Sequence, residues 1–174
     1  MTYSQSIEIE KTYLAKSYPV DIESSSFTKI VDVYLPDGEV STLRLRQKGD
    51  KFEITKKVPL KENSASGHTE YTIPLIEKEF DLLKNLSKKT VLKRRYKFTH
   101  NDFVGELDVF DGDLKGLVLV DFEFNSNADF NSFVMPDFCL TDVTEENFVA
   151  GKNLAGKNIK DIFNDLERFG YKIL

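Results

Sequence analysis

Pairs of acidic residues two positions apart recur along this chain, each on a segment whose other residues are mostly apolar. The pairs are Glu8 and Glu10, Glu106 and Asp108, and Asp121 and Glu123. Residues two apart point to the same side of a β-strand, so each pair presents two carboxylates together. Carboxylate oxygens are ligands that Mg²⁺ and Mn²⁺ favour, which makes these acids candidates for a metal site.

Basic residues occur with the same spacing. Arg44 and Arg46 alternate with leucines, and Lys93 and Arg95 form a second pair. Arginine and lysine bind phosphate oxygens through charge-assisted hydrogen bonds. If acidic and basic pairs face one cavity, metal ions and a phosphate-bearing ligand between them would offset the charges of both signs. Any single pair also fits a sheet with one wet face, and a purely structural network of salt bridges stays open.

The elements that must position these side chains are mostly strands. Eight segments have a strand pattern: Ser6–Leu14, Phe27–Tyr34, Thr42–Lys48, Lys51–Val58, His68–Ile73, Thr90–Phe98, Phe103–Asp111 and Leu117–Asn125. Eight short strands with few helices predict an α+β, mainly β fold, a closed eight-stranded antiparallel β-barrel with peripheral helices. Closure would remove exposed strand edges. A barrel of this size can enclose one small ligand.

Helical spacing of apolar residues predicts one helix whose first turn contains Pro74 and another in the tail, from about Ile159 to Phe169. A short helix is expected near Thr144, whose hydroxyl would cap a first turn containing Glu145 and Glu146.

Composition favours one globular domain, residues 1–174, because 40 % of the chain is hydrophobic and 30 % is charged. A net charge of −5 argues against a nucleic-acid binder. Cys139 is the single cysteine, so no intrachain disulfide can form, and a reducing compartment is favoured. No apolar run or leader suggests a membrane span or export. We expect a cytoplasmic monomer or homodimer without nucleic-acid or membrane partners.

Seven segments, taken in order, match one known family. They are IEIEKTYL (Ile7–Leu14), LRLR (Leu43–Arg46), FEITKK (Phe52–Lys57), TEYTIPL (Thr69–Leu75), KRRY (Lys93–Tyr96), GELDVFDGDLKGLVLVDFEF (Gly105–Phe124) and DVTEENFVAGKNLAG (Asp142–Gly156). Each fragment is weak alone, but their order and spacing are specific. They resemble the CYTH, or triphosphate tunnel metalloenzyme, family. The resemblance implies a barrel whose charged lumen binds a triphosphate through divalent metal ions.

Roles carry across from the family by position. Its opening Glu-x-Glu motif matches Glu8 and Glu10, the candidate catalytic acids. The candidate metal ligands are Glu8, Glu10, Glu70, Glu106, Asp108, Asp121 and Glu123. The candidate triphosphate contacts are Arg44, Arg46, Lys57, Lys93 and Arg95, together with Thr55.

Three positions depart from the family pattern. Thr12 stands where the family has a lysine, and Lys11 precedes it. On an ideal strand Lys11 points away from the paired acids, unless a bulge turns it inward. Thr72 replaces a frequent second glutamate, and His68 stands where arginine is common.

The resemblance implies metal-dependent hydrolysis of inorganic or nucleoside triphosphate with Mg²⁺ or Mn²⁺. One alternative is a class IV adenylyl cyclase, which would use a ribose hydroxyl as nucleophile, although no adenine pocket is recognisable. Another is a phosphate-binding module without catalysis, which the Thr12 departure favours.

Other candidate residues have plainer interpretations. His68 and His100 are expected at the surface or in turns, because their spacing fits no metal signature. Cys139, between Phe138 and Leu140, is expected to be a packed thiol. The stretch Gly151–Asn158 is similar to a phosphate-binding P-loop but lacks its Ser or Thr, and we interpret it as a helix end and turn near the barrel mouth.

Overall fold

The computed structural model describes residues 3–22, 25–35, 43–60 and 67–174. Its strands are β1 (Ser4–Ala15), β2 (Phe27–Leu35), β3 (Leu43–Lys48), β4 (Lys51–Pro59), β5 (Gly67–Leu75), β6 (Thr90–His100), β7 (Phe103–Phe110), β8 (Val118–Glu123) and β9 (Cys139–Asp142). The eight predicted strands correspond to β1–β8 with ends shifted by at most two residues. The start of the third prediction, Thr42, lies outside the described residues.

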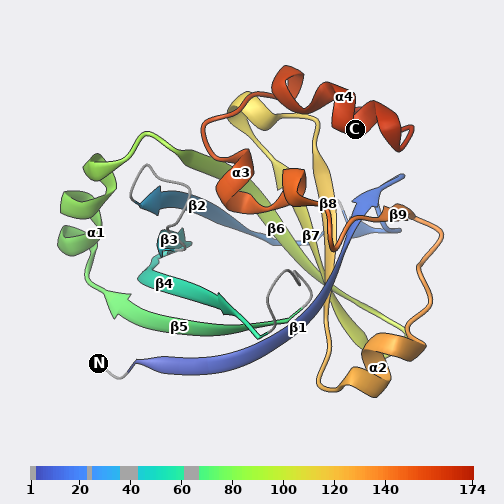
Figure 1. Cartoon of the computed structure of the whole chain (residues 1–174), viewed down its shortest axis with the longest axis horizontal. Helices are drawn as coiled ribbons and strands as arrows, with labels where there is room; N and C mark the ends of the chain where they lie inside the picture. Colours follow the sequence, from blue (N-terminus) through green and yellow to red (C-terminus); the bar gives the residue numbers. More distant parts are fainter. Residues whose placement is uncertain (1–2, 23–24, 36–42, 61–66) are drawn as a thin grey trace.

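Strands β1 to β8 form a closed antiparallel barrel (Figure 1). Their order around the wall is β1-β5-β4-β3-β2-β6-β7-β8, and β8 pairs with β1 again. The first half of β1 pairs with β5 and its second half with β8. The predicted barrel is therefore confirmed. Strand β9, which the sequence analysis did not predict, adds to the end of β1.

In the part of the chain that the structure describes, four α-helices lie around the barrel: α1 (Glu77–Leu83), α2 (Asn127–Ser132), α3 (Gly151–Leu154) and α4 (Phe163–Arg168). Short 3₁₀ turns occur at Lys84–Leu86, Gly112–Leu114, Asn147–Val149 and Ile159–Ile162. Among the described residues, none of the helices has the length and apolar character needed to cross a membrane.

Two of the helix predictions need correction. Pro74 belongs to β5, and α1 begins later, where the Glu79 carboxylate accepts a hydrogen bond from the Ile76 N–H at 2.9 Å. The helix expected at Thr144 is wrong. The hydroxyl and backbone N–H of Thr144 both donate to the Asp142 carboxylate, at 2.6 and 2.9 Å, so the hydroxyl is engaged in a local turn. The tail helix is confirmed, as a 3₁₀ turn followed by α4.

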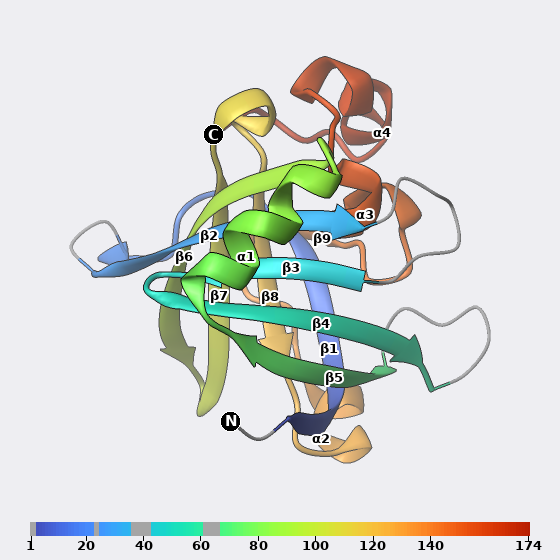
Figure 2. The same cartoon turned by 90° about the vertical axis from the view of Figure 1, so that its left-hand side faces the viewer.

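Most apolar residues of the strands point outward, and many of them are buried under the helices and loops, although Ile7 of β1 and Ile73 of β5 are exposed. Helix α1 covers the side of the barrel formed by β3 and β4 (Figure 2), and its Phe80 is in one buried cluster with Val33 and Leu45.

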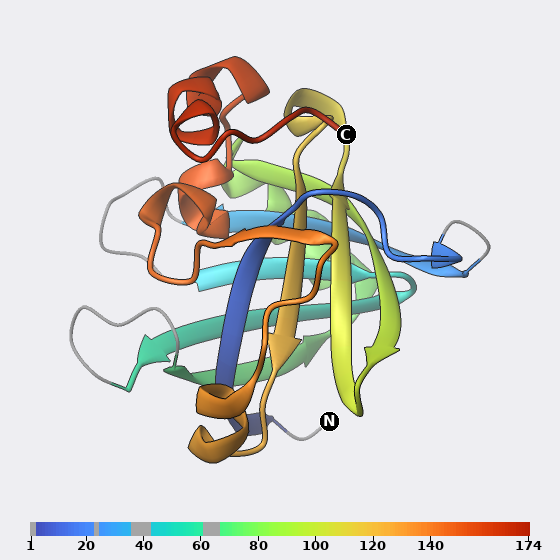
Figure 3. The ribbon, with the colours of Figure 1, turned by 90° about the vertical axis from the view of Figure 1, so that its right-hand side faces the viewer.

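The tail buries Leu154 and Leu166 over one end of the barrel, and α2 lies at the other end (Figures 1 and 3). Much of the hydrophobic core thus lies between the barrel wall and its covering segments. Inside the barrel, Val91, Phe110 and Leu119 pack under the tail at one end, and the charged side chains line the rest of the interior.

Candidate active site

The charged faces of all eight barrel strands meet in a cavity of about 510 Å³. Period-2 alternation explains this arrangement, since every strand that packs apolar residues outward must turn its other face inward. Each site residue predicted from the sequence lines the cavity: Glu8, Glu10, Arg44, Arg46, Lys57, Glu70, Lys93, Arg95, Glu106, Asp108, Asp121 and Glu123. The structure therefore brings all of them together.

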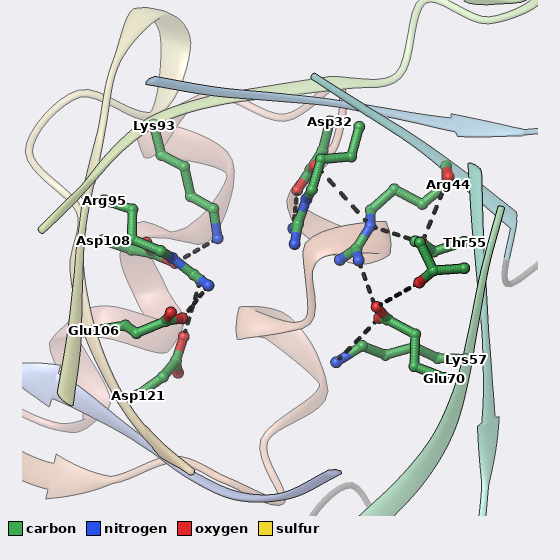
Figure 4. A network of polar contacts seen from close by, with 12 residues as sticks. Asp32, Arg44, Thr55, Lys57, Glu70, Lys93, Arg95, Glu106, Asp108 and Asp121 are labelled. Carbon is green, nitrogen blue, oxygen red and sulfur yellow. Dashed lines mark hydrogen bonds and ion pairs between the residues drawn. The ribbon is translucent and has the colours of Figure 1, made fainter. Parts of the chain in front are cut away.

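One wall of the cavity, from β6, β7 and β8, holds its charges in a dense network (Figure 4). Arg95 donates two hydrogen bonds of 2.6 Å to Asp108 and also pairs with Glu106. Lys93 contacts the same Asp108 carboxylate. Burial alone would raise the pKa of Asp108, but the Arg95 and Lys93 charges outweigh it and hold that pKa well below its ordinary value. Asp108 thus fixes two basic groups in position.

The opposite wall, from β3, β4 and β5, is organised around Lys57. Its Nζ lies 2.7 Å from Glu8, 3.6 Å from Glu10 and 3.9 Å from Glu70. Burial disfavours the charged amine, but Glu10 and Glu8 outweigh it and raise the pKa of Lys57. Arg44 donates to Glu70 at 3.1 Å. The basic groups of this wall are therefore charged and directed at the cavity (Figure 4).

Asp32 on β2 is a site residue that the sequence analysis missed. Its buried carboxylate accepts two hydrogen bonds of 2.7 Å from Arg46. Asp32 stands alone in an apolar strand instead of in a pair, so the spacing rule did not find it. The sequence did contain a signal for Asp32, because its neighbours Val31 and Val33 indicate a buried position. A buried carboxylate requires a partner, and this requirement indicates a nearby basic residue.

Carboxylates crowd together where β1, β7 and β8 meet. Glu10 lies directly across from Glu123, and Glu106 lies across from Asp121. Burial, and after it the charge of Asp108, raises the pKa of Asp121 to about 7. Burial and then Glu106 raise the pKa of Glu123. Like charges placed opposite each other are destabilising, and Lys57 beside Glu10 and Arg95 beside Asp121 offset only part of the acidic charge, so this side of the cavity has a deficit of positive charge.

A divalent cation fits that deficit. The donors are all carboxylate oxygens, which suit Mg²⁺ or Mn²⁺ better than softer metals. Among the described residues, Glu123 has no ion pair, and the ion pair of Asp121 is a 3.5 Å contact to Arg95. Within the described ranges, no group of three or more acids, histidines or cysteines has side chains arranged to hold a metal ion as they stand.

The position of Lys11 is settled by the structure. Strand β1 runs without a bulge from Glu10 to Leu14, so Lys11 points outward, and its Nζ lies 4.5 Å from the centre of the Phe130 ring. Thr12 faces the cavity in its place and donates a hydrogen bond of 2.8 Å to Asp121. No lysine therefore enters the cavity from this part of β1.

The expectation that His68 lies at the surface or in a turn is wrong. His68 belongs to β5 and lines the cavity beside Glu70. Burial, and then the Lys57 charge, lower its pKa. The alternation that places Glu70 inward also places His68 inward, and this signal was available in the sequence. His100, at the end of β6, packs instead on Phe122 and Phe138.

One end of the cavity is lined by the segment after β9. Glu145, Glu146 and Lys152 reach it, as does Gly151 of α3. The P-loop-like stretch is thus a short helix and turn at the barrel mouth, as predicted. Cys139 is buried, which confirms the packed thiol. Of the residues that line this end of the cavity, Gly151 and Lys152 were placed near the mouth by the sequence analysis, whereas Glu145 and Glu146 were not.

Comparisons with known proteins agree with this geometry. An inorganic triphosphatase of Nitrosomonas europaea is 33 % identical over 156 residues, which is 85 % of this chain and 96 % of that protein. A crystal structure of an inorganic triphosphatase has a TM-score of 0.64 at 30 % identity and covers 85 % of this chain and 93 % of its own. No protein-family model matches.

A more distant structure shares only the fold. It is a Bacillus halodurans protein suggested to be an adenylate cyclase, with a TM-score of 0.54 and 16 % identity. The match covers 98 % of this chain and 93 % of that chain.

Proposed function

The chain belongs to the CYTH family of triphosphate tunnel metalloenzymes, and from this membership we propose that it hydrolyses a triphosphate inside its charged barrel. The observation that carries the proposal is one cavity in which the strands present eight carboxylates and five arginine or lysine side chains. The relative named as an inorganic triphosphatase makes inorganic triphosphate the first substrate to test. Nucleoside triphosphates come next.

The basic groups would bind the phosphates. Arg44 and Lys57 lie on one wall, and Lys93 and Arg95 lie on the other (Figure 4). Arg46, held by Asp32 of β2, lies on β3 beside Arg44. A chain of phosphates can contact both walls at once, exchanging these groups' present carboxylate partners for phosphate oxygens. Such preorganised cations offset charge that develops during phosphoryl transfer.

Carboxylates with few basic partners would hold the metal. We assign Glu10, Asp121 and Glu123 as its main ligands. The neighbouring acids can also bind the metal when their basic partners move to the phosphates; they are Glu8, Glu70, Glu106 and Asp108. A divalent cation, Mg²⁺ or Mn²⁺, supplies Lewis-acid polarisation of phosphate oxygens when bound. Without it, the acidic side of the cavity would repel the substrate.

Glu8 and Glu10 are the candidate groups that receive a proton from the attacking water. Both carboxylates lie within 4 Å of Lys57 Nζ, at 2.7 and 3.6 Å, so the amine fixes their position. We favour hydrolysis over cyclisation because, among the described residues, few aromatic rings line the cavity and could stack on a nucleobase. These aromatic rings are those of Tyr34, His68 and Phe110.

We further infer that the protein acts as a single domain in the cytoplasm, as a monomer or homodimer, on a small-molecule substrate. The net charge of −5 and the lone cysteine support this setting, without nucleic acid or membrane as partner.

The deciding experiment measures phosphate release from inorganic triphosphate, ATP and GTP with Mg²⁺, with Mn²⁺ and with a chelator, and identifies the nucleotide products. We expect metal-dependent release of phosphate. Formation of cyclic nucleotide would instead identify a cyclase, and tight triphosphate binding without turnover would identify a binding module.

Variants test the site itself. Lys57→Ala should lower kcat/KM by about 10²-fold, since a preorganised cation is lost. Lys56→Ala is the matched control, because Lys56 is the exposed neighbour on the outer face of β4. Glu10→Gln and Arg46→Ala should also impair turnover. If both leave it unchanged in folded protein, the site lies elsewhere.

A further inference from the structure

The wall formed by β4 and β5 presents its cavity-facing residues as successive cross-strand pairs. Thr55 lies across from Thr72, Lys57 across from Glu70, and Pro59 across from His68. On its other side His68 lies across from Glu8 of β1. Following the wall past Lys57, the next row therefore consists of Pro59, His68 and Glu8.

This row has a single hydrogen-bond donor in its side chains. Proline has no polar side-chain group, and an ionised glutamate only accepts, whereas a neutral imidazole donates from one nitrogen and accepts at the other. A phosphate oxygen that lies beyond Lys57 would meet the Glu8 carboxylate, which repels it. His68 is the one side chain of the row that can bind it.

The imidazole also lacks a partner at one of its nitrogens. Nδ1 of His68 is enclosed by protein, and among the buried side-chain nitrogen and oxygen atoms of the described residues it alone has no hydrogen bond. An unsatisfied buried polar atom is unfavourable, so a ring orientation that satisfies it is preferred once a partner is present. Rotation about the Cβ–Cγ bond interchanges the two edges of the ring, and this torsion is broad and roughly two-fold.

We infer that His68 is a substrate-binding residue, which turns when a triphosphate enters and donates from Nδ1 to an oxygen of the phosphate that lies past Lys57. The inference rests on the proposed triphosphatase function. Phosphate oxygens only accept, so the bound ring carries its proton on Nδ1. The charged groups that face it are Lys57 of β4, Glu8 and Glu10 of β1, and Glu145 of the segment after β9.

Kinetics separate this role from packing. His68→Leu keeps the bulk of the side chain but removes the donor, and it should raise the KM for inorganic triphosphate about tenfold, with kcat changed less. His68→Asn places an amide near the former Nδ1 and should restore most of the affinity. His100→Asn, on a histidine outside the cavity, should match the wild type. An unchanged KM in folded His68→Leu, or a His68→Asn protein as weak as His68→Leu, contradicts the inference.

Nitrogen NMR gives a readout that does not depend on turnover. The chain has two histidines, so ¹⁵N-histidine labelling gives two imidazole rings, and His100→Asn assigns them. Ca²⁺, a hard cation that also takes carboxylate oxygens, replaces Mg²⁺ or Mn²⁺ in this binding experiment. Adding inorganic triphosphate with Ca²⁺ should move the His68 Nδ1 signal to the range of a protonated ring nitrogen, and the His100 signals should stay in place. If triphosphate binds and the His68 signals do not move, the inference is wrong even for an active enzyme. If the wild type neither binds nor hydrolyses triphosphate, the proposed function itself has failed.

Discussion

At the scale of single residues, the cavity holds its basic groups in position with carboxylates. Lys57 contacts Glu8 at 2.7 Å, and Arg46 is held by Asp32. In the absence of a ligand these carboxylates keep the buried cations paired, and in the proposed complex phosphate oxygens would take their place. Breaking a buried pair by removing one partner is costly, because an uncompensated charge stays inside. Stability and function therefore depend on the same charges.

Asp32→Asn should lower the free energy of unfolding at pH 7 by about 3 kcal/mol, since Arg46 then stays buried without a carboxylate. Arg46 holds the pKa of Asp32 below its ordinary value despite burial, and a carboxyl with a lowered native pKa stabilises above its unfolded pKa of about 4. That contribution is lost as the pH falls further. In urea unfolding, the difference in the free energy of unfolding between wild type and variant should be larger at pH 7 than at pH 3.

The matched control is Asp111→Asn. Asp111 pairs with Arg94 at 3.1 Å, but both side chains are more than a third exposed, so its loss should cost under about 1 kcal/mol. An equal gap for Asp32→Asn at both pH values would mean that its effect comes from packing instead of ionisation.

At the scale of elements, alternation explains what the sequence could and could not predict. Pairs such as Arg44 and Arg46 reveal their strand face because a period of two fixes it. Asp32 stands alone on its face and was missed. His68 shares a face with Glu70, and it was misplaced although the alternation indicated its position. The helix expected at Thr144 failed because Asp142 binds the hydroxyl. The short strand β9 depends on pairing with the distant β1, a contact that no local pattern indicates.

Helix α3 approaches the barrel closely at one point. A Cβ added to Gly151 would collide with the hydroxyl of Tyr34 on β2, and both residues line the cavity. Gly151→Ala should therefore push α3 away from the barrel mouth and cost about 1–3 kcal/mol of stability, with reduced turnover. Urea unfolding and phosphate release measure both effects.

Removing the obstructing atom should reverse the damage. In the double variant Gly151→Ala/Tyr34→Phe, the new methyl group at position 151 takes the place of the Tyr34 hydroxyl. The free energy of unfolding of the double variant should therefore be higher than the sum of the two single effects predicts. Strict additivity would show that α3 and β2 are not in the contact described.

At the scale of the whole molecule, the barrel is closed by β1, which pairs with β5 along one half and with β8 along the other. A triphosphate bound as we propose would touch side chains from strands on both sides of this closure. Binding thus opposes separation of the two walls, and in a single cooperative domain the binding free energy adds to the free energy of unfolding.

Inorganic triphosphate with Ca²⁺ should accordingly raise the melting temperature. At a ligand concentration 100 times Kd the gain is about 2.7 kcal/mol. For a chain of this length that corresponds to about 5–10 °C in a thermal-unfolding scan. With a chelator the shift should largely vanish, because Glu10 and Glu123, placed opposite each other, then repel the polyanion. Glu123→Gln should reduce the dependence on the cation, whereas Lys56→Ala should behave as wild type. Equal shifts with and without the cation would show that the acidic side of the cavity does not face the substrate, since uncompensated carboxylates cannot accept a polyanion without cost.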